Sequence, residues 1–245
     1  MAPGPALSVV TGAASGIGRA VAARLARRGD RLLLLDIDVS GGEAVARELG
    51  AQFMELDLTD DAAIRTAGDR IVGDHGAPDV LVNAAGWDRL EPFLENSWEF
   101  MQQIVQLNLL GAIKLSQSLL PAMIQADTGA ARIVNVASDA GRVGSSGETV
   151  YAGAKGGIIA FSKSLAREVA RHRITVNCVC PGPTDTPLFR SLPERMQEAL
   201  TRAIPFRRLA EPDEVAAAIE FFASPDAGFV TGQVLSVSGG LTMAG

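Results

Sequence analysis

Short runs of apolar residues alternate along the chain with longer segments in which apolar positions recur at helical spacing. The runs are rich in Val, Leu and Ile and predict buried strands at residues 7–10, 32–35, 52–56, 80–82, 132–136, 174–179 and 234–237. The segments between them predict helices near residues 17–28, 43–49, 60–74, 97–125, 149–171 and 212–223. Apolar strands that alternate with helices are typical of a parallel sheet covered on both faces. The pattern therefore predicts an α/β fold, a doubly wound parallel sheet of about seven strands.

Nothing in the chain divides it into separate parts. No Pro-, Gly- or Ser-rich linker, run of like charges or internal repeat interrupts the alternation, so we expect residues 1–245 to form a single domain. The one irregular stretch is 181–205, which is rich in proline and has room for a short helix. Loops of this length are usually functional, and here we expect one that covers the substrate.

The composition excludes several classes of function. Of the 245 residues, 47% are hydrophobic and 20% are charged, which is the balance of a globular protein and not of a disordered one. The net charge is −6, so neither nucleic acid nor an anionic membrane surface is expected as a partner. No window approaches 18 uninterrupted apolar residues, and no basic segment precedes an apolar one at the N-terminus. We therefore expect a cytoplasmic protein that does not enter a membrane.

The cysteines suggest no chemistry of their own. Cys178 and Cys180 stand two positions apart in an apolar run, so on a strand both point to the same face and a disulfide between them is not expected. Neither has a Cys or His partner at the spacing of a metal site. The sequence therefore predicts no bound metal.

The first predicted strand runs into a glycine-rich turn. Residues 11–18, TGAASGIG, open the first predicted helix, and the backbone N–H groups of such a turn suit a diphosphate. Gly12 would allow the tight turn, Gly16 a close approach to the pyrophosphate, and Gly18 close packing of helix on strand. The spacing G-x-x-x-G-x-G differs from the general dinucleotide fingerprint G-x-G-x-x-G, so a plain strand-to-helix connection is the alternative.

An acidic residue stands at the end of the second predicted strand. Asp36 follows the run RLLLL, 18 positions after Gly18, where a carboxylate can accept hydrogen bonds from both ribose hydroxyls of an adenosine. A 2′-phosphate there would meet this carboxylate, with no Arg or Lys at positions 12–18 or 37–38 to offset it. The sequence therefore predicts NAD as the cofactor rather than NADP. Asp57 ends the third strand in the same way and is expected near the adenine ring.

Four residues are candidates for catalysis. Tyr151 is the only tyrosine in the chain, and Lys155 follows it by four positions, on the same face of a predicted helix. A free tyrosine has a pKa of about 10, which a nearby ammonium lowers, so Tyr151 is a candidate general base. Ser138 stands just beyond a predicted strand, on the side of the sheet where ligands bind. Asn108 is a polar residue in an otherwise apolar helical segment.

Together these motifs resemble the short-chain dehydrogenase/reductase family over essentially the whole chain. Residues 11–18 match the family's glycine motif T-G-x-x-x-G-x-G, and Asn108, Ser138, Tyr151 and Lys155 match its catalytic tetrad. The resemblance implies a Rossmann fold and NAD-dependent oxidation of a secondary alcohol to a ketone. It also implies that Ser138 binds the substrate oxygen and that Tyr151 transfers its proton. Lys155 would lower the pKa of Tyr151 and hold the nicotinamide ribose, while Asn108 would hold a water in a proton relay.

The same resemblance implies further residues at the cofactor. Pro181 and Gly182 match the family's Pro-Gly pair after the sixth strand, with Thr184 and Thr186 near the nicotinamide carboxamide. The segment 83–86, N-A-A-G, stands where the family has N-N-A-G. The expected cofactor set is Gly12, Ser15, Gly16, Ile17, Gly18, Asp36, Asp57, Leu58, Asn83, Gly86, Tyr151, Lys155, Pro181, Gly182, Thr184 and Thr186.

Four segments resemble a branch of the family that acts on alicyclic CoA esters, the 2-hydroxycyclohexanecarboxyl-CoA dehydrogenases. They are AAGWD at 84–88, SDAGRVGSSGE at 138–148, CPGPTDT at 180–186 and SGGLTM at 238–243. This branch oxidises a ring hydroxyl to a ketone with NAD. We therefore expect Trp87 to pack on an alicyclic ring, Ser138 to bind the reacting oxygen and Arg142 to meet a CoA phosphate.

Other interpretations stay open. The substrate could be a simpler cyclic alcohol such as cyclohexanol. The chain could also be a 3-oxoacyl thioester reductase, similar to the fatty-acid elongation enzyme of the family, although Asp36 argues against the NADPH that enzyme usually takes. A non-catalytic dinucleotide sensor is a third possibility, which the intact tetrad argues against. The family further implies a homotetramer, formed through the helices that begin near residues 97 and 149.

Overall fold

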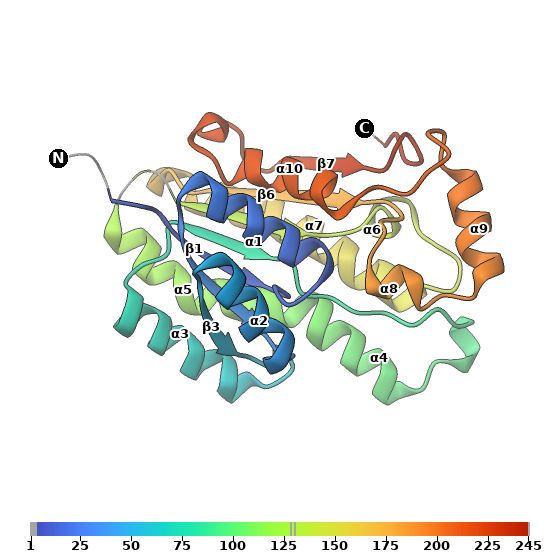
Figure 1. Cartoon of the computed structure of the whole chain (residues 1–245), viewed down its shortest axis with the longest axis horizontal. Coiled ribbons are helices and arrows are strands. Elements are labelled where there is room, and N and C mark those ends of the chain that lie inside the picture. Colours follow the sequence, from blue (N-terminus) through green and yellow to red (C-terminus); the bar gives the residue numbers. More distant parts are fainter. Residues whose placement is uncertain (1–3, 128, 130, 245) are drawn as a thin grey trace.

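A parallel sheet of seven strands forms the centre of the computed structural model, which describes residues 4–127, 129 and 131–244 (Figure 1). The strands are β1 (Leu7–Thr11), β2 (Arg31–Asp36), β3 (Gln52–Glu55), β4 (Val80–Asn83), β5 (Arg132–Val136), β6 (Thr175–Pro181) and β7 (Val234–Val237). Their order in the sheet is β3-β2-β1-β4-β5-β6-β7, and every neighbouring pair is parallel. Each connection between strands must therefore cross over a face of the sheet.

Helices make these crossovers and cover both faces. The α-helices are α1 (Gly16–Arg28), α2 (Val39–Leu49), α3 (Asp61–His75), α4 (Trp98–Val105), α5 (Ala112–Ala126), α6 (Ala140–Val143), α7 (Thr149–Val169), α8 (Pro187–Arg190), α9 (Glu194–Ala203) and α10 (Pro212–Phe222). Short turns of other kinds are η1 (Phe93–Glu95), η2 (Gln106–Gly111), η3 (Ala170–His172) and η4 (Pro225–Ala227). α1, α2 and α10 pack on one face, and α3, α5 and α7 on the other (Figure 1).

Two apolar cores result from the alternation of side chains along the strands. Val9 belongs to the core under α3, α5 and α7, whereas its neighbour Val10 belongs to the core under α1 and α10. Both valines are fully buried, as are Leu119 in the first core and Ile219 in the second. Because both faces are buried, the sheet holds the loops that follow the ends of its strands.

The fold class predicted from the sequence is confirmed. All seven strands and the helices between them lie within a few residues of their expected positions. Two stretches differ. Residues 181–205 carry two helices, α8 and α9, where one short helix was expected, and the long helix expected at 97–125 is divided in its middle by η2, a π-helical turn.

The stretch Trp98–Ala126 is long and apolar enough to span a membrane by length and composition alone, with a hydropathy of 1.3 over its window. Here it forms α4, η2 and α5, in which Ile104, Leu115 and Leu119 are fully buried within the protein. Packing against the sheet therefore accounts for part of its apolar character. That the protein does not enter a membrane stays a prediction.

The strand order places a ligand crevice beside β1. The sheet grows from β1 in both directions: β2 and β3 lie on one side of it, and β4 to β7 lie on the other. In doubly wound sheets, ligands bind at the carboxyl ends of the strands where the order changes direction in this way. The loops after β1 and β4 meet there. Thr11 Oγ1 accepts hydrogen bonds from the backbone N–H groups of Ala84 and Ala85, at 3.0 and 3.1 Å.

Candidate active site

A cavity of about 1030 Å³ lies along the carboxyl ends of the strands. It is slightly larger than the range of roughly 300–1,000 Å³ typical of small-molecule sites, which suits an extended ligand such as a dinucleotide. Most of the cofactor residues expected from the sequence line it. They are Gly12, Ser15, Gly16, Ile17, Gly18, Asp36, Asp57, Leu58, Gly86, Tyr151, Lys155, Pro181, Gly182, Thr184 and Thr186.

The glycine-rich turn is a cradle that side chains would fill. Gly12 adopts a φ of +65°, which favours glycine, and a Cβ there would lie 2.7 Å from Cα of Ala85. A Cβ on Gly18 would lie 2.1 Å from the carbonyl oxygen of Gly12, so helix α1 packs directly on the turn. Helix α1 starts at Gly16, beside the cavity. The free N–H groups of its first turn suit a pyrophosphate, and the site therefore fits a dinucleotide.

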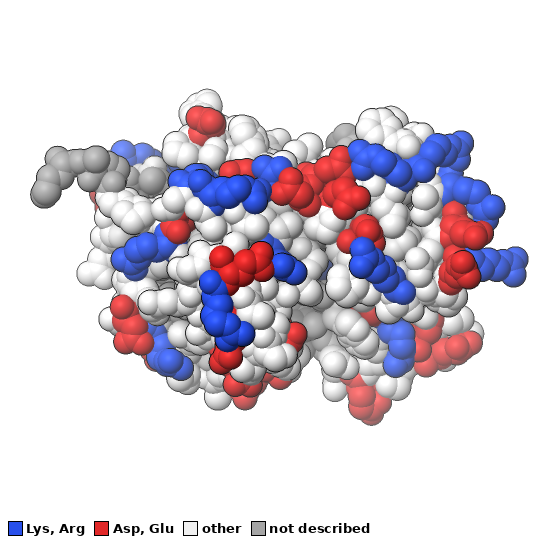
Figure 2. Space-filling model, in the orientation of Figure 1, with Lys and Arg blue, Asp and Glu red and all other residues white. Residues whose placement is uncertain are grey.

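Asp36 lies at the cavity where the adenosine end of a dinucleotide is expected. Its Oδ2 accepts a hydrogen bond from the N–H of Ala14 at 2.9 Å, and its Oδ1 accepts one from Asp38 at 3.0 Å. Among the described residues that line the cavity, Lys155 is the only Lys or Arg. Elsewhere acidic and basic side chains are interspersed over the surface seen in Figure 2. A 2′-phosphate beside Asp36 would therefore meet a carboxylate, and no Arg among the described lining residues would offset it.

Tyr151, Lys155 and Ser138 come together on the opposite side of the cavity. Tyr151 and Lys155 stand one turn apart on α7, with Nζ of Lys155 5.6 Å from the centre of the Tyr151 ring. The Lys155 ammonium donates to the carbonyl of Val136 at 2.9 Å, which ties α7 to the end of β5. Ser138 follows that strand and lies close enough to Tyr151 for its hydroxyl to affect the pKa of the phenol. The three residues thus line one cavity, and their catalytic roles stay predictions.

Burial changes the proton affinities of this group. It lowers the pKa of Lys155 to about 8 because the charged ammonium loses water. It raises the pKa of Tyr151, an effect to which the carboxylates of Glu148 and Asp88 add, while the nearby Ser138 hydroxyl opposes it. In the protein alone the phenol is therefore protonated at neutral pH. Lys155 is not among the groups that shift the pKa of Tyr151 in the protein alone, so the expected lowering of that pKa by Lys155 stays a prediction.

Asn108 lies behind the wall of the cavity and does not line it. It sits in the π-helical turn η2, where its Nδ2 donates to the carbonyls of Trp87 and Ile104 at 2.8 and 3.0 Å and its Oδ1 accepts from the N–H of Trp87 at 3.2 Å. A Cβ on Gly86 would lie 2.8 Å from this Oδ1 and 3.1 Å from Nζ of Lys155. Asn108 is thus a positioning residue for the loop after β4, and its part in a proton relay stays a prediction.

Two expected contacts are not where the sequence suggested. Asn83 is buried and does not line the cavity; its Nδ2 donates to Asn135 at 2.8 Å and Ser116 at 3.2 Å, so it braces β4, and a contact with the cofactor stays a prediction. Arg142 does not line the cavity. Its guanidinium donates to Ser236 Oγ at 2.6 Å and to the carbonyl of Ala244, so it anchors the C-terminal segment rather than a CoA phosphate.

Trp87 lines the cavity, as expected for a substrate contact, and packs edge-on against Phe100 with ring centres 6.0 Å apart. Sequence reasoning missed several of its neighbours. Asp88 and Glu148 line the cavity near Tyr151, and no spacing in the sequence singled them out. Apolar residues of α8, α9 and the segments beside them line the cavity, and the covering of a substrate by this stretch stays a prediction. They are Leu188, Phe189, Leu192, Met196 and Leu200.

Asp88 is expected to make the stability of the fold depend on pH. Burial raises the pKa of Asp88 from 3.8 to about 7. The negative charges of Glu148 and Glu91 add to this rise, and Arg89 opposes it. Between these two pH values the folded chain keeps a proton on Asp88 that the unfolded chain releases. The free energy of unfolding therefore falls as the pH rises from about 4 to about 7. At pH 8 we expect Asp88→Asn to exceed the parent in free energy of unfolding by roughly 2–4 kcal/mol. Urea unfolding from pH 4 to 8 measures this, and parallel pH profiles for the two proteins would contradict it.

A strand–turn–helix cradle for a diphosphate beside a Ser-Tyr-Lys cluster defines an oxidoreductase that binds a nicotinamide dinucleotide. The comparisons with known proteins agree. A family model described as enoyl-(acyl carrier protein) reductase matches residues 12–242. The chain therefore belongs to the short-chain dehydrogenase/reductase family.

Similar proteins in this family give a more specific indication. The chain is 38% identical over 239 residues to the 3-oxoacyl-(acyl-carrier-protein) reductase of Escherichia coli (strain K12), covering 97% of each chain. It is 37% identical over 243 residues to the reductase of the same description from Pseudomonas aeruginosa, covering 97% of this chain and 98% of the relative. A crystal structure described as ribose-5-phosphate isomerase from Brucella melitensis 16M superposes with a TM-score of 0.92 at 34% identity, covering 99% of this chain and 94% of that one. The two reductases correspond to the thioester alternative and not to the alicyclic CoA-ester branch.

Proposed function

We propose that the protein interconverts a ketone and a secondary alcohol by hydride transfer, and that a 3-oxoacyl thioester is its first candidate substrate. The observation that carries the proposal is the convergence of Ser138, Tyr151 and Lys155 on the cavity that holds the glycine-rich cradle. The bound dinucleotide would give or take the hydride at the reacting carbon. The 3-oxoacyl reductases among the relatives support the choice of substrate.

The residues of this chain have separate tasks in the proposed reaction. Ser138 would hold the substrate oxygen by a hydrogen bond, next to the Tyr151 phenol. In the reductive direction Tyr151 would donate its proton to that oxygen as negative charge develops there. Lys155 lies close enough to steady the resulting phenolate. Oxidation of an alcohol would run the same steps in reverse.

An alicyclic alcohol is a second candidate substrate, supported by the cavity wall. Trp87 and the apolar residues of α8 and α9 offer a surface for a saturated ring. Lys155 is the one cation among the described lining residues, and its ammonium already donates to Val136, so CoA phosphates would have to lie outside the cavity. Assays of NADH and NADPH at 340 nm with acetoacetyl-CoA, cyclohexanone, cyclohexanol and 2-hydroxycyclohexanecarboxyl-CoA would separate the candidates. Failure of every ketone and alcohol would overturn the proposal.

NAD(H) is the proposed cofactor, on the strength of Asp36. We expect the double substitution Asp36→Ala with Ile37→Arg to shift the ratio of kcat/KM for NAD over NADP toward NADP by about tenfold or more, since a cation replaces a repelling carboxylate. Ile37 is 62% exposed and lines the cavity, so an Arg side chain has room there. The matched control is Asp38→Ala, a neighbouring carboxylate that does not line the cavity. An unchanged ratio in the double variant would place the ribose elsewhere.

A homotetramer is the proposed assembly, following the family. The exposed side of α4 supports a contact with another copy, since Trp98 is 80% exposed. Analytical ultracentrifugation of the purified chain would measure the mass directly.

A further inference from the structure

The turn that carries Ser138 is attached to two neighbouring strands. It leads from β5 into α6, and Ser138 lines the cavity from it. The N–H of Ala140 donates to Oγ of Ser138 at 3.1 Å, so the direction of the hydroxyl depends on the shape of the turn. The N–H of Asp139 donates to the carbonyl of Pro181 at 3.1 Å, which attaches the turn to the end of β6. Side chains of the same turn make a second attachment, to β7.

One hydroxyl group makes the attachment to β7. Oγ of Ser236 donates to Oδ1 of Asp139 and accepts a hydrogen bond from Nη1 of Arg142 at 2.6 Å. Asp139 is buried, and within the described part of the chain its carboxylate accepts no other hydrogen bond. Hydrogen bonds to charged groups are stronger than those between neutral groups. Ser236 therefore joins the first and the last residue of the stretch 139–142, which directly follows Ser138.

A hydroxyl that binds a reacting oxygen must be held accurately. Displacement of such a group by about 1 Å can lower the rate about 100-fold, and the residues that support it keep it in place. We infer that Ser236 is a positioning residue of the active site: through Asp139 and Arg142 it fixes the turn from which Ser138 presents its hydroxyl to the substrate oxygen. Ser236 itself is not among the described residues that line the cavity. The inference rests on the proposed function and adds to it a residue on β7.

Removal of this hydroxyl tests the inference. In Ser236→Ala we expect kcat for reduction of acetoacetyl-CoA or cyclohexanone, whichever the parent reduces faster, to fall about tenfold. The Kd for NADH should stay within about twofold of the parent's, because the cradle after β1 is untouched. Ser236→Thr keeps a hydroxyl on the strand and should recover most of the lost kcat. Ser118→Ala is the control, since it removes a half-buried serine hydroxyl that bonds within α5 and does not line the cavity.

A double-mutant cycle separates positioning of Ser138 from a general effect on the fold. If Ser236 acts through Ser138, the loss caused by Ser236→Ala should shrink to less than about twofold when Ser138 is already replaced by Ala. A residue that only stabilised the protein would lower kcat by the same factor in both backgrounds. The cycle therefore gives a readout that a merely structural role would not change.

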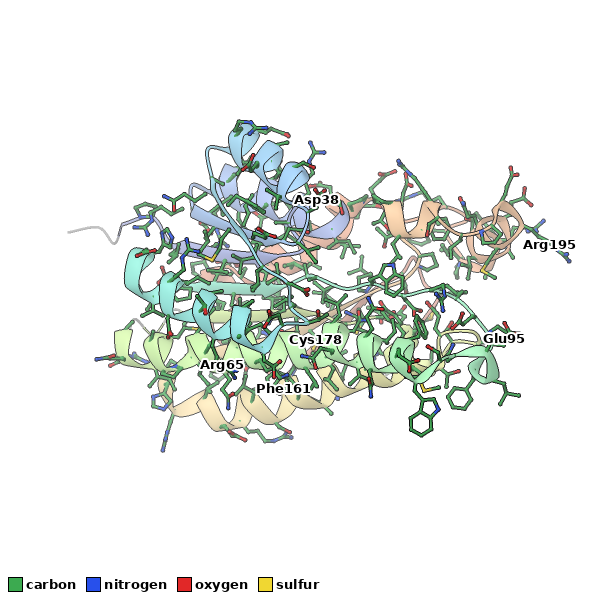
Figure 3. The ribbon with its side chains drawn as sticks, turned by 90° about the horizontal axis from the view of Figure 1, so that it is seen from below. Asp38, Arg65, Glu95, Phe161, Cys178 and Arg195 are labelled. Carbon is green, nitrogen blue, oxygen red and sulfur yellow. The ribbon has the colours of Figure 1, made fainter. Side chains whose placement is uncertain are left out.

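Arg142→Met keeps the test decisive if Ser236→Ala does not fold. It keeps a long side chain without the N–H donors, and its kcat must also fall in a way that depends on Ser138. Its control is Arg65→Met, since Arg65 is exposed on α3 and does not line the cavity (Figure 3). Variants with the parent's kcat, or a loss that persists in full after Ser138→Ala, would overturn this inference alone. A parent that turns over no ketone or alcohol would overturn the proposed function and this inference with it.

Discussion

Replacing Tyr151 with Phe is expected to lower kcat by about 10²–10⁴-fold in either direction of the reaction, the usual contribution of a general acid or base. The ring is kept, so its packing in the wall with Ala154 and Val150 remains and only the hydroxyl that exchanges the proton is lost. Binding of NADH should change little, because the cradle after β1 is untouched. Steady-state rates together with NADH fluorescence titration separate the two effects.

The outcome also distinguishes an enzyme from a dinucleotide sensor. Because Tyr151 is the only tyrosine, loss of tyrosine absorbance confirms the substitution directly. A Phe variant that keeps more than about a tenth of the parent rate would mean that another group transfers the proton. Weakened NADH binding without any change in kcat would instead assign Tyr151 to the cofactor alone.

Gly18→Ala is expected to damage both the fold and the cofactor site. The new Cβ would lie 2.1 Å from the Gly12 carbonyl oxygen and 2.6 Å from its carbon, so helix and turn must separate. Overpacking of this kind costs about 1–3 kcal/mol in free energy of unfolding. The N–H groups of the turn would no longer converge on one anion, so we expect the Kd for NADH to rise about tenfold or more, as judged by fluorescence titration.

Helix α3 offers the matched control. Gly73 is an exposed helical glycine with nothing within 4 Å of an added Cβ, so Gly73→Ala should leave NADH binding unchanged. It should raise the free energy of unfolding by about 0.5–1 kcal/mol, because alanine loses less entropy in a helix. If both variants bound NADH as tightly as the parent, the turn at Gly18 would not be the diphosphate site.

The sheet could be predicted from the sequence because its strands are apolar on both faces and alternate along the chain with helical segments. The glycine turn, Ser138 and the Tyr151–Lys155 pair could be predicted for a similar reason, since each depends on local spacing or on the end of a strand. Their convergence required only the rule that parallel strands present their carboxyl ends at one edge.

Contacts between distant segments could not be predicted in this way. Arg142 is occupied by Ser236 and Ala244, roughly a hundred positions away, and no local pattern signals that partner. The apolar spacing of this segment continues without a break and by itself predicts one unbroken helix. The π-helical turn at Asn108 therefore left no signal in the sequence. In the sequence Asp88 resembles any loop carboxylate, and only the fold shows that it is buried. The one available signal was a charge beside Trp87 in a segment already assigned to the site.

The scarcity of cations in the cavity has a kinetic consequence. A dinucleotide brings a diphosphate toward a protein whose net charge is −6, and Lys155 is the only Lys or Arg on the described cavity wall. Binding of the dinucleotide therefore depends on backbone N–H groups that act at short range. Its diffusional approach gains no electrostatic steering from the protein. At 0.15 M salt the Debye length is about 8 Å, so added salt mainly screens the long-range repulsion. The association rate constant for the dinucleotide should therefore stay constant or rise as the ionic strength increases. In a protein whose cavity is lined by arginines, the same rate constant would fall.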